Sequence, residues 1–472
     1  PELAPGYAEC GEARELVASA AFRERLAALR AAAGVDYAGV TACKLQVLSK
    51  VHAFFRRHAS ESQLAAYRGF IAEKGQALED YALFHAIQGV AAAAPEADRR
   101  WPGAYAGPGS VDAREFAGRH PAEIDFHMWL QWVAGNQLAA TEKTARDAGM
   151  SLGLYRDLAV GVSGGGAEAW SDPALYSRGA SVGAPPDPLA LQGQDWGIPP
   201  MLPGVLRERA YQPVIDLFAS NMGRHGALRI DHVMVLFRLW WVPAGQPSSA
   251  GSYVYYRLDD LFGILALESH RRQCLVIGED LGTVPEQIRH AMPDYGVWSY
   301  RVFYFEHDEA GRCRAPQDYP REALVTISTH DLPPLTSYWR GSDIDLRESL
   351  DLYPEPVMAE RSRDERRRDL QLILDALSER GLISAETAKL ELHPDLDPEV
   401  LGAILRYLGQ SAAGVAAVQL EDWVGVDSPV NVPGTGDEYP TWRRKLPEDW
   451  DRLLEREDVW NLARVIGDAR GG

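Results

Sequence analysis

Basic residues are few in this 472-residue chain: 48 Lys and Arg stand against 67 Asp and Glu, which gives a formal net charge of −19 at pH 7. A surface this acidic repels the phosphates of nucleic acids and anionic membrane surfaces, so we expect neither as a partner. No apolar run in the sequence reaches the roughly 18 residues that a membrane-spanning helix needs. A neutral substrate fits this charge better.

Cysteine is also sparse, and the four cysteines form no C-x-x-C pair. Their spacing is typical neither of a zinc site nor of a disulfide scaffold. Cys274 stands in an apolar run and is predicted to be a core residue. This cysteine usage fits a reducing, cytoplasmic setting. The twelve histidines include no H-x-H or H-E-x-x-H spacing, and neither glycine-rich phosphate-binding motif occurs, so we expect no metal and no cofactor.

The first third of the chain is rich in helix-forming residues. Residues 11–33 and 122–148 each predict a long helix, and Ser60 with Gln63 predicts a capping box at the start of another. Residues 1–148 are therefore predicted to be a mostly helical subdomain region.

After Gly149 the pattern changes to short β-rich runs that alternate with helical or irregular stretches. The candidate strands are 154–160, 227–233, 274–281, 300–305, 324–331 and 416–423. Near-continuous apolar strands separated by helices are typical of a parallel α/β sheet. A long Gly/Pro-rich segment, 161–203, interrupts them and is predicted to be a functional loop.

Acidic residues stand at the ends of four of these runs: Asp231, Glu279, Asp331 and Glu421. A (β/α)8 barrel places its chemistry at the carboxyl ends of its strands, so we expect the acids to converge on one face. The candidate strands are two short of a complete barrel.

Carboxylates around one pocket can cleave a glycosidic bond when one stays protonated and another stays ionised. Arg229 precedes Asp231 by two residues and lies on the same side of a strand, so it is predicted to keep Asp231 ionised, as a nucleophile requires. Glu279 has no neighbouring cation in the sequence and follows an apolar strand, so its pKa is predicted to be raised. Two alternatives stay open: these acids are ordinary salt-bridged strand ends, or they form a metal site with His232 and His330.

Seven long segments form a specific pattern: GLYRDLAVGV (153–162), SVGAPPD (181–187), GQDWGIPP (193–200), ALRIDHVMVLFRLWWVP (227–243), VIGEDLGTVP (276–285), STHDLPPLTSYW (328–339) and VNVPGT (430–435). They resemble the 4-α-glucanotransferases, also called amylomaltases or disproportionating enzymes, of glycoside hydrolase family 77. LYRDLAVGV followed by GGAEAW is similar to the bacterial maltose-system branch of that family. The resemblance extends over nearly the whole chain.

The resemblance implies an α-amylase-like (β/α)8 barrel of the TIM type, with inserted helical subdomains and with residues 149–472 as its catalytic part. It also implies a retaining double displacement that transfers α-1,4-glucan segments between maltooligosaccharides, with glucose as product or acceptor, in the metabolism of maltose, glycogen or starch. Asp231 would be the nucleophile and Glu279 the acid/base. Asp331 would hold the hydroxyl groups of the sugar.

The remaining roles that the resemblance implies concern substrate binding. Arg229 would orient Asp231, and His232 and His330 would donate hydrogen bonds to the same sugar. The other implied glucan contacts are Gln194, Trp196, Asp187 and Asn431. Asp157 would be either a site residue or the partner of a structural ion pair with Arg156 or another barrel residue.

The chain departs from the family pattern in two ways. Family members carry further barrel strands and a Ser-Pro-Tyr loop upstream of where this sequence starts, so we expect the chain to be a fragment that lacks its N-terminal strands. After GAPPD it reads PLALQ (188–192), without the aromatic pair of some relatives. The sequence leaves two alternative functions: an α-glucan hydrolase using the same carboxylates, and a glucan-binding fragment without turnover.

Overall fold

The computed structural model describes residues 1–93, 105–186, 192–223, 226–436 and 438–471. The chain divides into two compact units. Unit 1 contains Pro1–Tyr155, Gly161–Val182 and Trp196–Leu217, and unit 2 contains Arg156–Val160, Gly183–Asp195 and Phe218–Gly472. Across the described ranges, no helix combines the length and the apolar character needed to cross a membrane.

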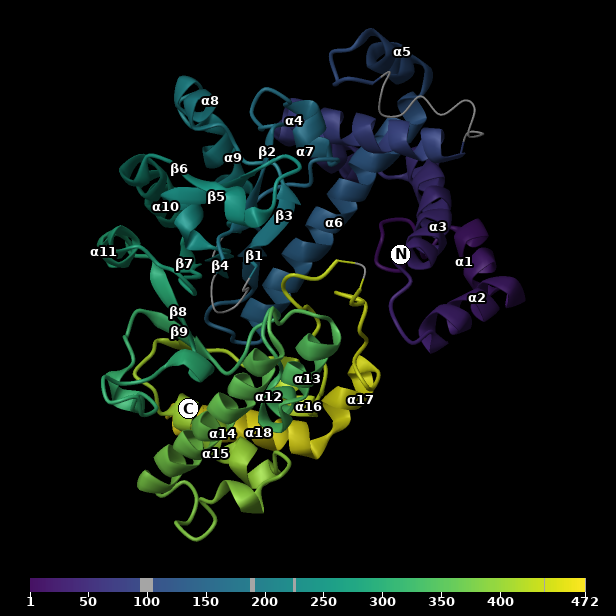
Figure 1. Ribbon diagram of the computed structural model, residues 1–472. Helices are drawn as coiled ribbons and strands as arrows, with labels where there is room; N and C mark the ends of the chain where they lie inside the picture. The colour runs from purple at the N-terminus through teal and green to yellow at the C-terminus, as the bar shows by residue number, and fades with distance from the viewer. Residues whose placement is uncertain (94–104, 187–191, 224–225, 437, 472) are drawn as a thin grey trace. The chain divides into compact units, whose positions relative to one another are not determined.

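Unit 1 is mostly helical, as the composition of its sequence predicts. Its longest helices are α4 and α6, which pack against each other (Figure 1). Their apolar faces meet α1 and α3 around Phe55, Tyr67 and Trp129, each almost fully buried. The helices of this part of the chain are α1 (Gly11–Ala18), α2 (Ala20–Ala31), α3 (Tyr37–His58), α4 (Glu61–Ala93), α5 (Val111–Arg119), α6 (Pro121–Asp147), α7 (Ala167–Ser171), α8 (Pro203–Glu208) and α9 (Gln212–Asn221).

Local signals at the helix ends account for several of these boundaries. The capping box is confirmed: the Ser60 N–H donates to Gln63 Oε1 at 2.8 Å, and the Gln63 N–H donates to Ser60 Oγ at 3.3 Å. Gly75 adopts φ +55°, a left-handed conformation that favours glycine, and it kinks α4. The prediction of one helix over 11–33 is wrong, because Ser19 is extended and its Oγ accepts from the Phe22 N–H to begin α2.

Unit 2 is built on a six-stranded sheet of order β1-β4-β7-β8-β9-β10 (Figure 1). The neighbouring pairs from β4 to β10 are parallel. The strands are β1 (Tyr155–Leu158), β4 (Gly226–Ile230), β7 (Cys274–Gly278), β8 (Trp298–Val302), β9 (Ala323–Thr326) and β10 (Val415–Ala416). Five of them overlap a predicted run by at least three residues. The prediction of a strand over 416–423 is wrong, because this run shares only Ala416 with β10 and Leu420–Val424 forms α16. This parallel half-barrel with many helices confirms the predicted α/β barrel class.

Helices and a hairpin surround this sheet. The strands β5 (Arg238–Pro243) and β6 (Ser252–Tyr255) pair antiparallel. The sheet packs against α14 and α15 through Tyr300, Val325 and Leu374, which are buried. The helices of this part are α10 (Leu258–Arg272), α11 (Glu286–Asp294), α12 (Leu335–Arg340), α13 (Ser342–Ser349), α14 (Pro356–Glu379), α15 (Pro398–Gly409), α16 (Leu420–Val424), α17 (Trp450–Glu455) and α18 (Glu457–Ala469).

The structure corrects two further expectations. The segment 161–203 is not a plain loop, because it contains α7, β2 (Ala180–Ala184) and β3 (Gln194–Ile198). Glu421 does not end a strand: β10 stops at Ala416, and Glu421 lies in α16. The prediction for Cys274 is confirmed, since this residue is buried.

Candidate active site

The carboxyl ends of β1, β4 and β7 bring Asp231 and Glu279 to one edge of the sheet. β4 and β7 run in register from Gly226 beside Cys274 to Ile230 beside Gly278. The ladder continues one residue further, because the Glu279 N–H donates to the Ile230 carbonyl at 3.0 Å and the Asp231 N–H donates to the Leu158 carbonyl at 3.0 Å. Each acid therefore follows directly after a buried strand.

A tight turn after β4 places the backbone of His232 against Glu279. His232 adopts φ +46°, an unfavourable conformation for a residue with a side chain. Its N–H donates to Glu279 Oε2 at 2.8 Å, and the next N–H, of Val233, donates to the Glu279 carbonyl at 2.9 Å. Gly278 permits this approach, because a Cβ there would lie 2.7 Å from Val233 Cγ2.

Arg229 links two carboxylates at the sheet edge. Its Nη1 lies 2.7 Å from Asp157 Oδ1 and 2.8 Å from Asp231 Oδ1, and its guanidinium lies over the Tyr300 ring. Asp157 thus pairs with a barrel residue and not with Arg156, whose Nη1 donates to the Asn221 carbonyl. Burial alone lowers the pKa of Arg229, but Asp231 and Asp157 raise it above its ordinary value. The cation is therefore permanent.

The pKa of Asp231 reflects its burial as well as its ion pair. Burial raises it, and the repulsion of Asp157 and Asp331 adds to this, while Arg229 opposes both. The predicted ion pair is present, and it opposes the rise in pKa without cancelling it. That Arg229 keeps Asp231 ionised stays a prediction. Asp231 and Asp157 each hold a direct ion pair with this buried guanidinium.

Glu279 has the environment that an acid/base residue requires. Its side chain is buried, and burial raises its pKa to about 7. Arg229 and two backbone N–H groups oppose the shift without cancelling it. The second of these donors is the Leu281 N–H, 2.6 Å from Oε1. The raised pKa agrees with the sequence-based prediction, although Arg229 is a cation close in space that the local sequence did not indicate.

Asp331 sits in a different environment. It lies beyond the end of β9, in the loop before α12, where His330 Nε2 is 3.2 Å from its Oδ2 and Asn431 Nδ2 donates to its Oδ1 at 2.6 Å. Burial alone would raise the pKa of Asp331, but His330, Asn431 and Arg229 together lower it. The hydrogen bond with Asp331 raises the pKa of His330.

The pKa of His232 is shifted in the opposite direction from that of His330. Burial, assisted by the positive charge of Arg238, lowers the pKa of the His232 imidazole to about 4. The ring is therefore neutral at pH 7 and can both donate and accept a hydrogen bond.

The remaining predicted glucan contacts are placed in part. Gln194 and Trp196 both lie on β3, and both are half-buried. Asp187 lies outside the described residues. The structure thus brings together seven of the predicted site residues in unit 2, namely Arg229, Asp231, His232, Glu279, His330, Asp331 and Asn431.

Sequence reasoning missed three polar residues around the site. Tyr300 lies beneath Arg229, and burial raises its pKa to about 12. Asp280 accepts from the Tyr300 N–H at 2.8 Å and pairs with Arg301 at 3.3 Å. Asp422, in α16, is fully buried. The acidic pair Glu279-Asp280 in the sequence could have indicated Asp280 as a site residue. Nothing near Tyr300 or Asp422 in the sequence indicates which residues they contact.

Chemically, this edge of the sheet combines Glu279, a carboxyl whose pKa is about 7, with the ionised carboxylate of Asp331 and the fixed cation of Arg229. Such a division of protonation states suits acid-assisted displacement at an acetal carbon. Within the described ranges, no group of three or more His, Cys, Asp or Glu side chains could hold a metal ion.

The sequence matches the family described as 4-alpha-glucanotransferase over residues 6–450. The chain belongs to this family. A 4-alpha-glucanotransferase of Haemophilus influenzae is 36% identical over 483 residues, covering 100% of this chain and 68% of the relative. The enzyme of that name from Mycobacterium bovis is 39% identical over 441 residues, covering 92% of this chain and 59% of the relative.

A solved structure agrees with this membership of the 4-alpha-glucanotransferase family. Amylomaltase from Corynebacterium glutamicum superposes with a TM-score of 0.84 at 33% identity, covering 98% of this chain and 64% of that one. The chain therefore spans about 60 to 70% of the length of these relatives.

Proposed function

We propose that this protein is a 4-α-glucanotransferase that moves α-1,4-glucan segments between maltooligosaccharides. The observation that carries the proposal is the pairing at the ends of β4 and β7: Glu279 is a buried carboxyl with a pKa near 7, and Asp231 next to it is bound to Arg229. The names of the relatives support the same reaction.

The first half-reaction breaks the glycosidic bond. The Asp231 carboxylate attacks the anomeric carbon, the bond from that carbon to the leaving O4 breaks, and the Glu279 proton passes to O4. The product is a glycosyl ester on Asp231 and a shortened glucan or glucose. Asp331, whose pKa is lowered, stays ionised and binds sugar hydroxyls while positive charge develops on the ring.

The second half-reaction restores the enzyme. The 4-hydroxyl of an acceptor sugar attacks the same carbon, its proton passes to the Glu279 carboxylate, and the ester bond to Asp231 breaks. Two displacements retain the configuration of the anomeric carbon. A pKa near 7 suits Glu279 to both directions of proton transfer.

The substrate contacts belong to the same proposal. We assign hydrogen bonds to the sugar to the neutral His232, to His330 and to Asn431, and glucan contacts to Gln194, Trp196 and Asp187. A Trp ring offers a flat apolar surface to the C–H face of a sugar. We place the helical residues 1–148 as a subdomain and 149–472 as the catalytic part, and we propose a cytoplasmic role in maltose, glycogen or starch metabolism.

The test is incubation of the protein with maltotriose, followed by chromatography of the products. Glucose together with a ladder of longer oligomers is the expected result. Glucose and maltose alone would mean that water replaces the acceptor, and the protein would be a hydrolase. Binding of maltotriose without products would mean that this chain binds glucan without turning it over.

A further inference from the structure

The loop between β9 and α12 carries two residues of the candidate site. β9 ends at Thr326 and α12 begins at Leu335, and His330 and Asp331 lie between them. A loop gives its side chains a fixed direction only when its own ends are fixed. The contacts at the two ends of this loop therefore bear on the geometry of Asp331.

One buried carboxylate contacts both ends of the loop. Asp422, in α16, accepts from Ser328 Oγ through Oδ2 at 2.7 Å and from the Leu335 N–H through Oδ1 at 2.6 Å. Its exposed fraction is 0%, and Ser328 and Leu335 are also buried. The two donors lie 94 and 87 residues away from Asp422 in the sequence. Asp422 thus links the two ends of the loop through its hydrogen bonds with Ser328 and Leu335.

The bond to Leu335 replaces a missing helix cap. The residue before α12 is Pro334, which provides no side-chain cap. The first N–H groups of a helix have no partner within the helix, and a buried one needs an acceptor from elsewhere. Asp422 supplies that acceptor for Leu335, so the start of α12 and the loop share one anchor.

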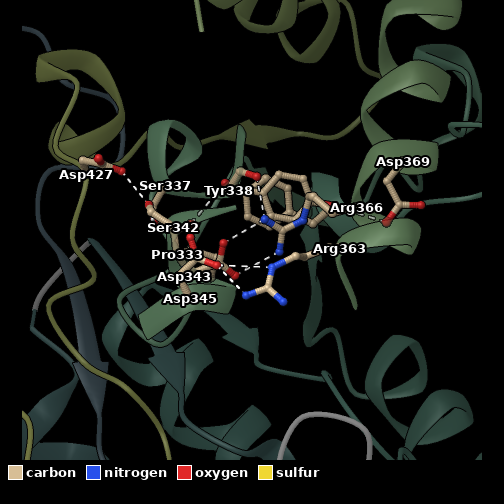
Figure 2. A network of polar contacts seen from close by, with 11 residues as sticks. Pro333, Ser337, Tyr338, Ser342, Asp343, Asp345, Arg363, Arg366, Asp369 and Asp427 are labelled. Carbon is tan, nitrogen blue, oxygen red and sulfur yellow. Dashed lines mark hydrogen bonds and ion pairs between the residues drawn. The ribbon is translucent and has the colours of Figure 1, made fainter. Parts of the chain in front are cut away.

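Other contacts hold α12 itself and Pro333, near the end of the loop before it. Figure 2 shows Tyr338 of α12 beside Arg366, whose guanidinium lies 3.5 Å from the ring centroid and forms two hydrogen bonds with Asp343, at 2.8 and 2.9 Å. Tyr304 stacks on the Tyr338 ring and its hydroxyl donates to the Pro333 carbonyl at 3.1 Å. These contacts hold α12 and the end of the loop, whereas Asp422 also holds the beginning.

Burying a carboxylate has a free-energy cost that these two bonds must offset. Burial raises the pKa of Asp422 to about 6, and Glu421 adds to the rise, while the Leu335 N–H and the Ser328 hydroxyl oppose it. At pH 7 the carboxylate form still predominates, and it accepts both hydrogen bonds at once.

We propose that Asp422 is a positioning residue for glucan transfer, which fixes both ends of the Ser328–Leu335 loop so that Asp331 stays within hydrogen-bonding distance of Asn431. This inference rests on the proposed function for its kinetic consequence. Asp422 itself is fully buried, so it acts through the loop that it contacts.

Two variants separate the contributions of the two loop ends. Asp422→Ala removes both bonds, and Ser328→Ala removes only the bond at the beginning of the loop and leaves the helix cap in place. Misplacement of a catalytic group by about 1 Å can cost about 100-fold in rate. We expect a 10- to 100-fold lower kcat per folded molecule for Asp422→Ala and a smaller loss, of about 3- to 10-fold, for Ser328→Ala, which keeps the helix cap.

The matched control is Asp397→Ala. Asp397 is another carboxylate that caps a helix, since its Oδ1 accepts from the Glu399 and Val400 N–H groups at 2.9 Å at the start of α15. Its loss should lower the melting temperature without lowering kcat per folded molecule. A kcat loss in this control equal to that of Asp422→Ala would show a general effect of stability and would overturn the proposal.

A second readout does not depend on activity. The hydrogen bond with Asp331 raises the pKa of His330, which can be followed by NMR of histidine labelled at Cε1, with His330→Gln to assign the signal. If Asp422 positions the loop, the His330 pKa in Asp422→Ala and in Ser328→Ala should fall toward its ordinary value.

The two readouts keep this inference distinct from the proposed function. If the unmodified chain makes no transfer products, the proposed function fails, and the His330 titration still tests the loop. An unchanged His330 pKa and an unchanged kcat in folded Ser328→Ala or Asp422→Ala would overturn the positioning role. If Asp422→Ala does not fold, Ser328→Ala alone decides.

Discussion

Replacing Glu279 by Gln tests the proposed chemistry at its central proton. The substitution keeps the shape of the side chain and removes the proton that Glu279 donates and accepts. General acid–base catalysis contributes about 10²- to 10⁴-fold to rate. Because Glu279 serves both half-reactions, we expect kcat for transfer from maltotriose to fall by at least about 10²-fold.

The structure also predicts a cost in stability for the same variant. Both oxygens of Glu279 accept from backbone groups: the His232 N–H at 2.8 Å and the Leu281 N–H at 2.6 Å. An amide NH2 group cannot accept, so Gln leaves one buried N–H without a partner, at a cost of about 1–3 kcal/mol. The melting temperature should therefore fall, and kcat must be expressed per folded molecule.

A substrate with a good leaving group separates the two effects. α-Maltosyl fluoride needs little assistance from an acid, so Glu279→Gln should still form the glycosyl ester on Asp231. Its second half-reaction lacks the general base, so the ester should accumulate and be visible by mass spectrometry of the intact protein. Glu268→Gln is the matched control, because Glu268 is 3% exposed and its Oε1 accepts from Arg271 at 2.7 Å on α10. This control should lose stability and keep its kcat.

The reasoning would be refuted by a folded Glu279→Gln protein that retains about a tenth or more of the wild-type kcat with maltotriose, since general acid–base assistance exceeds that factor. A loss of kcat in Glu268→Gln as large as in Glu279→Gln would assign the effect to stability instead of to proton transfer.

Three further predictions follow from the charges of the site. First, kcat/KM for maltotriose should fall as the pH rises through about 7, because the active form of free Glu279 is protonated; a profile that stays flat to high pH would contradict this. Second, Arg229→Met should raise the pKa of both Glu279 and Asp231, since Arg229 lowers each. The alkaline limb of the pH profile of the residual activity should therefore move to higher pH, and a limb that does not move would exclude this coupling. Third, transfer should persist in EDTA. If EDTA abolished transfer and a divalent cation restored it, the result would support the alternative of a metal site.

Short-range patterns in the sequence predicted much of the fold and of the site. The strands β4, β7, β8 and β9 were predictable because each lies in a short, mostly apolar run between polar segments. The ion pair between Arg229 and Asp231 follows from a spacing of two residues along one strand, since alternate side chains share a face. The Ser60–Gln63 capping box is equally local. Each of these features depends on neighbours within a few residues.

Only the tertiary structure decided which distant groups meet. Asp157 shares Arg229 across 72 residues, Asn431 binds Asp331 across 100, and Asp422 binds Ser328 across 94. These contacts, together with burial, set the charge states: they explain why the pKa of Asp231 is raised in spite of its cation.

The sequence by itself therefore determined the elements of the fold and which residue types stand at the strand ends, because propensity and periodicity act over a few residues. The tertiary structure decided how protons and hydrogen bonds are distributed among those residues. The physical reason is that desolvation and electrostatic interaction depend on separation in space, whatever the separation along the chain.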